Sequence, residues 1–240
     1  MPHRYFSTNK KENRIFLTPQ DAHHFCVVMR GRVNESILVC NGKGTDYICR
    51  AVTCSPDQCE LEIISSHKNV SEPSIQATIY IGYPKSEKLD WIIQKSVELG
   101  AVEIVPFFSR LCVVTPKKEE QKNIRYNRIA LEAAKQAGRG VIPQVHMPLS
   151  FEEMLKQAVK SDRALFCYEQ GGIALHSQFD PSVQTVAIIT GSEGGFTEQE
   201  AQCATDAGCT IIGLGPRILR CETAPLTALS VIMAQTGNLQ

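Results

Sequence analysis

The chain reads TGSEGGF over residues 190–196 and GLGPRILRCETA over residues 213–224. An apolar run typical of a buried strand precedes each stretch, and a predicted helix follows each one, over 197–207 and 223–236. Glycines at such turns let a ligand approach the backbone closely, and open α/β sheets bind ligands at the carboxyl ends of their strands. The two stretches therefore predict a parallel sheet with a ligand site at its carboxyl edge.

The kind of ligand follows from what the two stretches lack. Neither contains the G-x-G-x-x-G pattern of a dinucleotide site or the lysine of a phosphate-binding P-loop, which disfavours a nucleotide-dependent enzyme. The carboxylate of Glu193 would also repel a pyrophosphate. A cationic or neutral ligand such as S-adenosylmethionine fits better, although two tight turns without any ligand fit the spacing equally well.

Two patterns of predicted elements divide the chain. Short strands and one helix occupy residues 1–68, the polar segment 68–74 is typical of a linker, and strands alternate with helices from residue 75 onward. The alternation favours a mostly parallel sheet that is covered on both faces. We therefore predict a small β-rich domain over residues 1–72 and an α/β domain over residues 73–240.

The composition is that of an ordinary globular protein. The 240 residues are 43% hydrophobic and 21% charged, with 25 basic and 25 acidic side chains, which excludes wholesale disorder and a uniformly basic protein. The 10 cysteines include no C-x-x-C pair, so we expect reduced thiols in a cytoplasmic protein that holds no metal. The longest uncharged segment contains several polar residues, so we expect no membrane span.

Basic side chains gather in two parts of the chain. A predicted helix from residue 117 would place seven of them within an arc of about 140°: Lys117, Lys118, Lys122, Arg125, Arg128, Lys135 and Arg139. The first part of the chain adds Arg4, Arg14 and Arg30. Such groups neutralise the phosphates of RNA, although a solvated helix face shows the same pattern.

The last predicted helix, over 223–236, is apolar nearly all round. Such a helix is buried either in the core of its domain or in a contact between subunits. The residues themselves favour neither of these two interpretations.

These stretches resemble the 16S ribosomal RNA uracil-(N3)-methyltransferase family of the SPOUT superfamily. The motifs at 191–196 and 214–224 are the most specific, and the stretches 4–6 (RYF), 85–100 and 132–143 agree in order along the chain. The family usually has proline where Ser192 stands and threonine where Cys221 stands. Ser192 keeps the flanking glycines, whereas Cys221 removes a hydroxyl group beside Arg220.

The resemblance implies a SPOUT α/β domain whose last part threads through a trefoil knot, preceded by a PUA-like β-barrel that helps to bind RNA. It implies S-adenosylmethionine as the cofactor, 16S ribosomal RNA or the small ribosomal subunit as the partner, and a homodimer. The implied reaction is methylation of N3 of a uridine in that RNA. A non-catalytic RNA-binding protein that retains the fold is the alternative interpretation.

The resemblance and the chemistry together indicate the site residues. Uracil N3 has to lose its proton, and negative charge then spreads onto the carbonyl oxygens. We predict that Arg220 stabilises this charge, with Arg139 of either subunit as a second candidate, and that Glu193 or Glu222 accepts the proton. The predicted donor contacts are Gly191, Glu193, Gly194, Leu214, Gly215, Ile218, Leu219 and Ala224. The predicted RNA contacts are Arg4, Arg14, Arg30, Lys122, Arg125 and Arg128.

Overall fold

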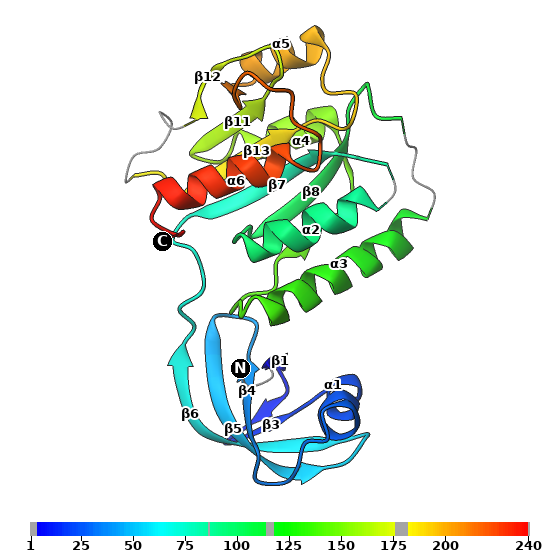
Figure 1. The fold of residues 1–240 in the computed structure, drawn as a ribbon, viewed down its shortest axis with the longest axis vertical. Coiled ribbons are helices and arrows are strands. Elements are labelled where there is room, and N and C mark those ends of the chain that lie inside the picture. Colours follow the sequence, from blue (N-terminus) through cyan, green and yellow to red (C-terminus); the bar gives the residue numbers. More distant parts are fainter. Residues whose placement is uncertain (1–3, 86, 114–117, 176–181, 240) are drawn as a thin grey trace. The chain divides into compact units, whose positions relative to one another are not determined.

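The computed structural model describes residues 4–85, 87–113, 118–175 and 182–239, and Figure 1 shows their fold. The chain forms two compact units, residues 1–72 with 134–142 and residues 73–133 with 143–240. The prediction assigned 134–142 to the second domain, whereas the structure counts this segment with the first unit. The reason is that the Glu72 carboxylate accepts hydrogen bonds from the backbone N–H groups of Gly140 and Val141, at 2.7 and 3.1 Å.

The first unit is built on a six-stranded sheet. Its strands are β1 (Arg4–Phe6), β2 (Lys10–Lys11), β3 (Arg14–Phe16), β4 (Ser36–Cys40), β5 (Thr45–Cys54) and β6 (Cys59–Lys68). They lie in the order β1-β4-β5-β6-β3-β2, and the pairing is antiparallel except between β1 and β4. Two register shifts between β5 and β6 bend this ribbon, and the sheet curls (Figure 1). The prediction of a β-rich first part is confirmed.

The helical segment of the first unit begins at Pro19. Helix α1 (Pro19–His23) is capped by Thr18, whose side-chain oxygen accepts a hydrogen bond from the backbone N–H of Asp21 at 3.2 Å. From His24 the chain continues as a π-helical turn, η1 (His24–Val28). Cys26 in this turn is disulfide-bonded to Cys54 at the end of β5, so the expectation of reduced thiols is wrong for this pair.

The second unit contains an eight-stranded sheet. Its strands are β7 (Gln76–Gly82), β8 (Glu103–Phe108), β9 (Gln144–Val145), β10 (Leu149–Ser150), β11 (Arg163–Cys167), β12 (Ile173–Ala174), β13 (Thr185–Thr190) and β14 (Thr210–Gly213). The order is β10-β8-β7-β13-β11-β14-β12, β9 pairs with β8, and every one of these pairs is parallel. The prediction of a mostly parallel sheet is confirmed.

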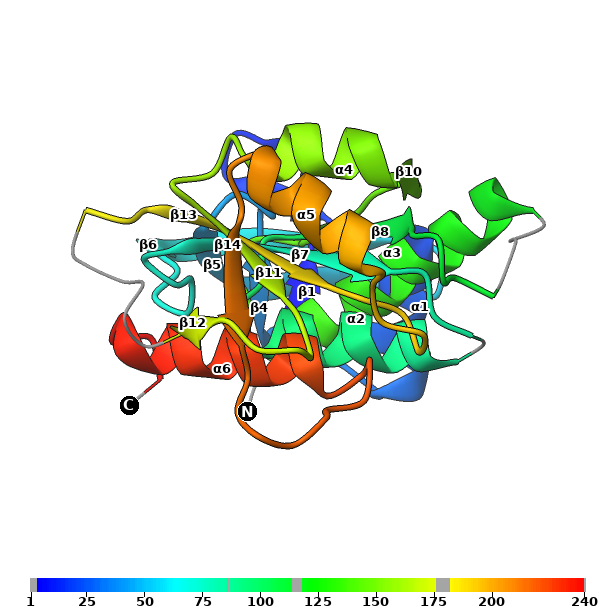
Figure 2. The same cartoon turned by 90° about the horizontal axis from the view of Figure 1, so that it is seen from above.

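Helices cover both faces of this sheet, as predicted. Helices α4 (Phe151–Ala158) and α5 (Glu198–Asp206) lie on one face, and α2 (Lys88–Glu98) and α6 (Ala224–Gln235) lie on the other (Figure 2). Thr197 and Glu200 form a capping box at the start of α5. Helix α3 (Glu119–Gln136) contains most of the predicted basic arc, whereas Lys117 lies outside the described residues.

An aromatic cluster anchors one of the two glycine stretches. Phe196 ends the stretch 190–196, and its ring lies 4.1 Å, between centroids, from the ring of Phe166 on β11. The ring of Phe107 also stacks with that of Phe196, with centroids 6.2 Å apart. All three side chains are buried, so the loop between β13 and α5 is tied to the core.

Within the described residues, no helix combines the length and apolarity needed to cross a bilayer.

Candidate functional site

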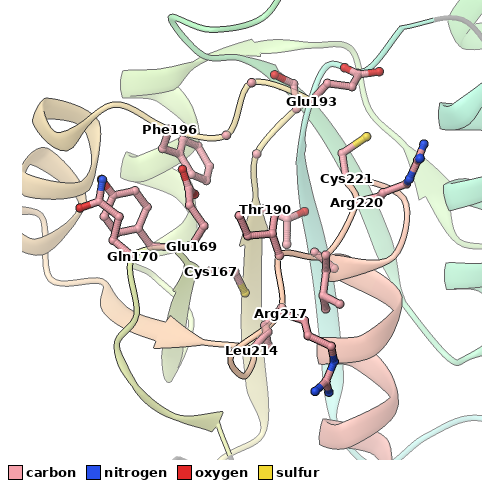
Figure 3. Close-up of a pocket in the computed structure, with 18 of the residues that line it drawn as sticks. Cys167, Glu169, Gln170, Thr190, Glu193, Phe196, Leu214, Arg217, Arg220 and Cys221 are labelled. Atoms are coloured by element: carbon pink, nitrogen blue, oxygen red, sulfur yellow. The ribbon is translucent and has the colours of Figure 1, made fainter.

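A cavity of about 640 Å³ lies at the carboxyl ends of three neighbouring strands, β11, β13 and β14 (Figure 3). Its walls come from the segments that follow these strands, together with Ala224 at the start of α6 and Lys88 at the start of α2. Because the strands are parallel and adjacent, the loops that follow them meet at one edge of the sheet. This is the edge at which the glycine stretches predict a ligand site.

The cavity gathers residues that the sequence analysis selected one by one. All the predicted donor contacts line it, namely Gly191, Glu193, Gly194, Leu214, Gly215, Ile218, Leu219 and Ala224. Arg220, the predicted charge-stabilising residue, also lines it, whereas Arg139 does not. The structure therefore places the two glycine stretches around one space, and the role of each residue stays a prediction.

Tight backbone packing explains the glycines of the first stretch. A Cβ atom on Gly191 would lie 3.0 Å from the Cα atom of Gly195, and Gly195 itself has a φ of +66°. The backbone N–H of Gly195 donates a hydrogen bond to the carbonyl oxygen of Ser192 at 3.0 Å, which closes the turn. Side chains at these positions would fill or distort the wall that a ligand has to approach.

Several polar groups at the cavity have no partner within the described part of the chain. The hydroxyl oxygens of Tyr168, Thr190 and Ser192 are buried without a hydrogen bond. Leaving such a group unsatisfied costs about 1–3 kcal/mol. Leu214 and Leu219 add apolar surface to the same cavity. Unsatisfied hydroxyls beside apolar side chains fit a ligand that carries both a flat apolar ring and hydroxyl or amide groups, as a nucleoside does.

Lys88 holds two carboxylates at one end of the cavity. Its Nζ atom lies 3.1 Å from Oε1 of Glu193 and 3.5 Å from Oε2 of Glu222. Burial alone would raise the pKa of Glu193, but hydrogen bonds, including those from Lys88 and Lys85, outweigh burial and lower this pKa. Burial would also raise the pKa of Glu222, but hydrogen bonds and the charge of Lys88 outweigh burial and lower this pKa. Both groups are therefore ionised at neutral pH, and Glu193 brings its negative charge to the wall of the cavity.

The thiol that replaces the family's hydroxyl group stays neutral. Burial raises the pKa of Cys221 to about 12, and a hydrogen bond to Glu222 adds to the effect. The Cys221 Sγ atom donates this bond to Oε2 of Glu222 at 3.2 Å. A neutral thiol can therefore orient Glu222 as a hydroxyl group would, although sulfur is the weaker donor.

Sequence reasoning missed the third wall of the cavity. It is formed by the segment after β11, where Glu169, Gln170 and Gly171 line the space. A Cβ atom on Gly195 would lie 2.9 Å from Oε1 of Glu169, so this carboxylate packs directly against the glycine stretch. No motif marks the segment. Only the strand order, with β11 between β13 and β14, could have revealed it.

Arg139 is held by an acidic partner instead of lining the cavity. Its side chain is 2% exposed, and its Nη2 atom lies 2.7 Å from Oε2 of Glu72. Its Nε atom donates to Oε1 of the same carboxylate at 2.9 Å. The Arg139 charge is therefore already paired and buried, and a catalytic role for Arg139 stays a prediction.

The pair makes a prediction about stability. Replacing Arg139 with methionine should lower the free energy of unfolding by about 2 kcal/mol at neutral pH, because Glu72 loses its charged partner. Burial would raise the pKa of Glu72, but Arg139 and backbone N–H groups lower it, so the stabilisation exists above the ordinary carboxyl pKa and fades as the pH falls through the lowered value. Urea unfolding at neutral and acidic pH measures both effects. An equal loss of unfolding free energy at both pH values would contradict this explanation.

The predicted RNA contacts separate into paired and unpaired cations. Arg4 is buried against Asp46, at 2.5 Å between Nη2 and Oδ1, so its charge is already paired, and its contact with RNA stays a prediction. Arg14 lies 3.5 Å from Glu60, and Arg125 pairs with Asp90. The exposed Arg30 and Arg128 and the half-exposed Lys122 have no ion-pair partner among the described residues.

Comparisons with known proteins agree with this geometry. Residues 71–233 match the model of an RNA methyltransferase domain, and residues 17–64 match that of an RNA methyltransferase PUA domain. The chain is 38% identical to the ribosomal RNA small subunit methyltransferase E of Bacillus subtilis, over 93% of this chain and 91% of that protein. A crystal structure of the protein of that name from Neisseria gonorrhoeae, bound to S-adenosyl methionine, is 30% identical with a TM-score of 0.88 over 98% of each chain. A putative methyltransferase from Legionella pneumophila, in complex with the bound cofactor SAM, is 27% identical with a TM-score of 0.88 over 98% of each chain.

Proposed function

This chain belongs to the ribosomal RNA small subunit methyltransferase E family, and we propose from that premise that it methylates N3 of a uridine in 16S ribosomal RNA with S-adenosylmethionine. Membership of the family agrees with the predicted fold class, a SPOUT-type α/β domain with an N-terminal PUA-like domain. The observation that carries the proposal is the cavity of the second unit, because it gathers every residue that the resemblance assigns to the donor. The knot stays a prediction.

The residues around the cavity fit this donor. When it is bound, S-adenosylmethionine supplies a methyl group on a positively charged sulfur. The carboxylates of Glu169 and Glu193 line the cavity and are the groups that would attract a sulfonium. The basic side chains of Lys88, Arg217 and Arg220 line the same cavity, so this attraction is local. The unsatisfied hydroxyls of Thr190 and Ser192 are available to a ribose or an adenine, and Leu214 and Leu219 can cover a flat ring.

The chain's own residues have two tasks in the transfer. The N3 proton of the uracil passes to a carboxylate, for which Glu193 is our choice, as N3 gains the methyl group and the sulfur keeps the electron pair of the broken bond. Arg220 neutralises the charge that develops on the uracil oxygens. The lowered pKa of Glu193 makes it a weak base that is ionised over the whole neutral range, so alignment contributes more than basicity.

The proposal is tested by incubating the protein with small ribosomal subunits that lack their native methylation and with an isotope-labelled methyl donor. Label in 3-methyluridine is the expected result. Label in another nucleoside would keep methyl transfer and overturn the N3 assignment. A non-catalytic RNA-binding protein is the second candidate, supported by the departures at Ser192 and Cys221. It would give RNA binding without label and without donor binding.

The proposed homodimer would use the outer face of α6. The inner face of this helix is buried, whereas Leu226 and Val231 are half-exposed, and Trp91 on the neighbouring α2 is 52% exposed. We predict that Val231→Glu lowers the mass in light scattering from that of a pair of chains to about 26.6 kDa. The matched substitution Gln202→Glu, on exposed α5, should leave the pair intact. A single-chain mass for the unaltered protein would contradict the prediction.

A further inference from the structure

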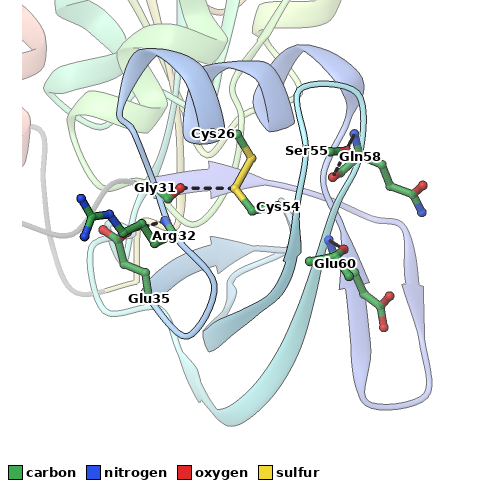
Figure 4. The surroundings of a disulfide bond; sticks show 9 residues. Cys26, Gly31, Arg32, Glu35, Cys54, Ser55, Gln58 and Glu60 are labelled. Carbon is green, nitrogen blue, oxygen red and sulfur yellow. Dashed lines mark hydrogen bonds between the residues drawn. A yellow bond between two sulfur atoms is a disulfide. The ribbon is translucent and has the colours of Figure 1, made fainter.

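Three sulfur atoms of the first unit come together, one from η1 and two from the connection between β5 and β6. Cys26 lies in η1, Cys54 ends β5 and Cys59 begins β6, and their Sγ atoms all lie within 4.8 Å of one another. Cys26 and Cys54 are bonded, with Cα atoms 6.0 Å apart, and Figure 4 shows the surroundings of this bond. Cys59 stands opposite Cys54 in the β5–β6 pairing. None of these cysteines has a part in the proposed methyl transfer.

We propose that Cys26 and Cys54 form a reversible thiol–disulfide exchange site, and that its redox state sets the conformation of the basic turn formed by residues 30–32. The reaction partner of this site is a dithiol reductant. The consequence for RNA rests on the proposed function, because Arg30 is one of the predicted RNA contacts.

The exposure of the three sulfur-bearing residues suits exchange at one bond. Cys26 and Cys54 are half-exposed, whereas Cys59 is fully buried. One thiolate of the dithiol attacks Sγ of Cys26 or Cys54, breaks the disulfide and forms a mixed disulfide. Its second thiol then resolves that bond. The dithiol gives up two electrons and two protons and becomes a disulfide, and Cys26 and Cys54 become two thiols.

The surroundings favour exchange over capture of a metal ion. The three cysteines lie in or against the apolar core of the first unit, with Ile15, Phe25 and Leu61 among its members. Burial raises the pKa of Cys59 to about 11, so a thiolate is disfavoured there. A metal held by these residues would need three thiolates in the same apolar setting, whereas a disulfide beside a neutral thiol buries no charge. Because Cys59 is rarely a thiolate, it also does not attack the Cys26–Cys54 bond and displace Cys26.

The bond is linked to the basic turn through Gly31. The backbone N–H of Gly31 donates to the carbonyl oxygen of Phe25 in η1 at 2.9 Å, and a Cβ atom on Gly31 would lie 2.4 Å from the Phe25 ring. The carbonyl oxygen of Gly31 lies 3.4 Å from Sγ of Cys54. A disulfide sulfur has no proton to donate, whereas a reduced Cys54 thiol can donate to this carbonyl. Reduction therefore frees η1, to which Gly31 is bonded through Phe25, from β5, and in exchange adds only a weak thiol donor at the Gly31 carbonyl.

The turn needs such support because its backbone is unusual. Arg30 has a φ of +55°, a conformation that residues other than glycine adopt only when their surroundings hold it. The N–H of Arg32 donates to Oε2 of Glu35 at 2.9 Å, and the Arg30 and Arg32 side chains are exposed (Figure 4 shows Arg32 and Glu35). With η1 no longer tied to β5, we expect this turn to relax and its two guanidiniums to lose their fixed spacing.

The exchange site is tested first without RNA. Alkylation under denaturing conditions should modify 8 cysteines before treatment with dithiothreitol and 10 after it. Under native conditions, trypsin should cut after Arg30 and Arg32 about fivefold faster in the reduced protein, as a coupling of about 1 kcal/mol implies. Cys26→Ser should be cleaved as fast as the reduced protein. Cys59→Ser and the exposed-cysteine control Cys203→Ser should be cleaved as slowly as the oxidised protein. Full alkylation of the untreated protein, equal cleavage of both forms, or protection of all three thiols by one equivalent of zinc or monovalent copper would overturn the proposal.

The consequence for RNA is measured separately. A fluorescein-labelled RNA hairpin of mixed sequence should bind the oxidised protein about fivefold more tightly than the reduced protein or Cys26→Ser. Equal affinity together with redox-dependent cleavage would overturn the link to RNA and keep the exchange site. Failure of both forms to bind RNA would count against the proposed function, while the trypsin result would still decide the exchange site.

Discussion

Replacing Gly194 with valine is expected to abolish binding of S-adenosylmethionine while the protein still unfolds near the temperature of the unaltered chain. Gly194 lines the cavity, and a Cβ atom there would lie 2.8 Å from Cβ and 2.9 Å from the backbone oxygen of Leu111. A backbone oxygen cannot move aside as a flexible side chain can, so the loop 190–196 has to shift away from the donor. Strain of about 3 kcal/mol corresponds to more than a hundredfold loss of affinity. Isothermal titration calorimetry measures this loss.

Two further variants make the result specific to the loop. Gly194→Ala adds only the first clashing atom, so its affinity for S-adenosylmethionine should lie between those of the valine variant and the unaltered protein. Gln202→Ala, on the exposed side of α5, should leave donor affinity unchanged. Donor affinity that is retained in a folded Gly194→Val protein would sink the assignment of this loop to the donor. Unfolding of the variant would contradict the expectation that the loop is not needed for the fold.

Much of the fold follows from local signals in the sequence. The apolar run that precedes the first glycine stretch forms β13, and the helix predicted over 197–207 forms as α5. These features depend on residues a few positions apart, which a single sequence displays. The order of the strands depends on the path of the chain between them, and no local pattern reveals that β14 lies between β11 and β12. The two-residue strands β9, β10 and β12 are too short for any periodicity to show.

The same distinction explains the outcome at the site. The glycine stretches carry their own signal, because glycine is needed where the backbone folds tightly, and both stretches line the cavity. The predictions for Arg4 and Arg139 depended on the basic pattern of the sequence and on the resemblance, and neither of these reveals ion-pair partners. Asp46 stands 42 residues after Arg4, and Glu72 stands 67 residues before Arg139. Both acidic partners therefore lie far beyond the range over which helical or strand periodicity connects residues.

Replacing Arg220 with methionine is expected to slow methyl transfer about a thousandfold and to leave donor affinity within a factor of about three, because a charge-stabilising group acts mainly in the transition state. Arg220 is exposed at the cavity and has no ion-pair partner within the described residues, so its charge is available to a substrate. Arg217 lines the same cavity, and Figure 3 shows the two guanidiniums pointing away from each other, which makes Arg217→Met the matched control. Single-turnover transfer of labelled methyl groups to small ribosomal subunits measures the rate, and calorimetry measures the donor affinity.

Equal losses of rate in Arg220→Met and Arg217→Met would assign the effect to the overall positive charge of the cavity, and an unimpaired Arg220→Met protein would remove this residue from the mechanism. Arg220→Lys separates charge from geometry, since lysine keeps the charge but loses the planar pair of donors that matches adjacent uracil oxygens.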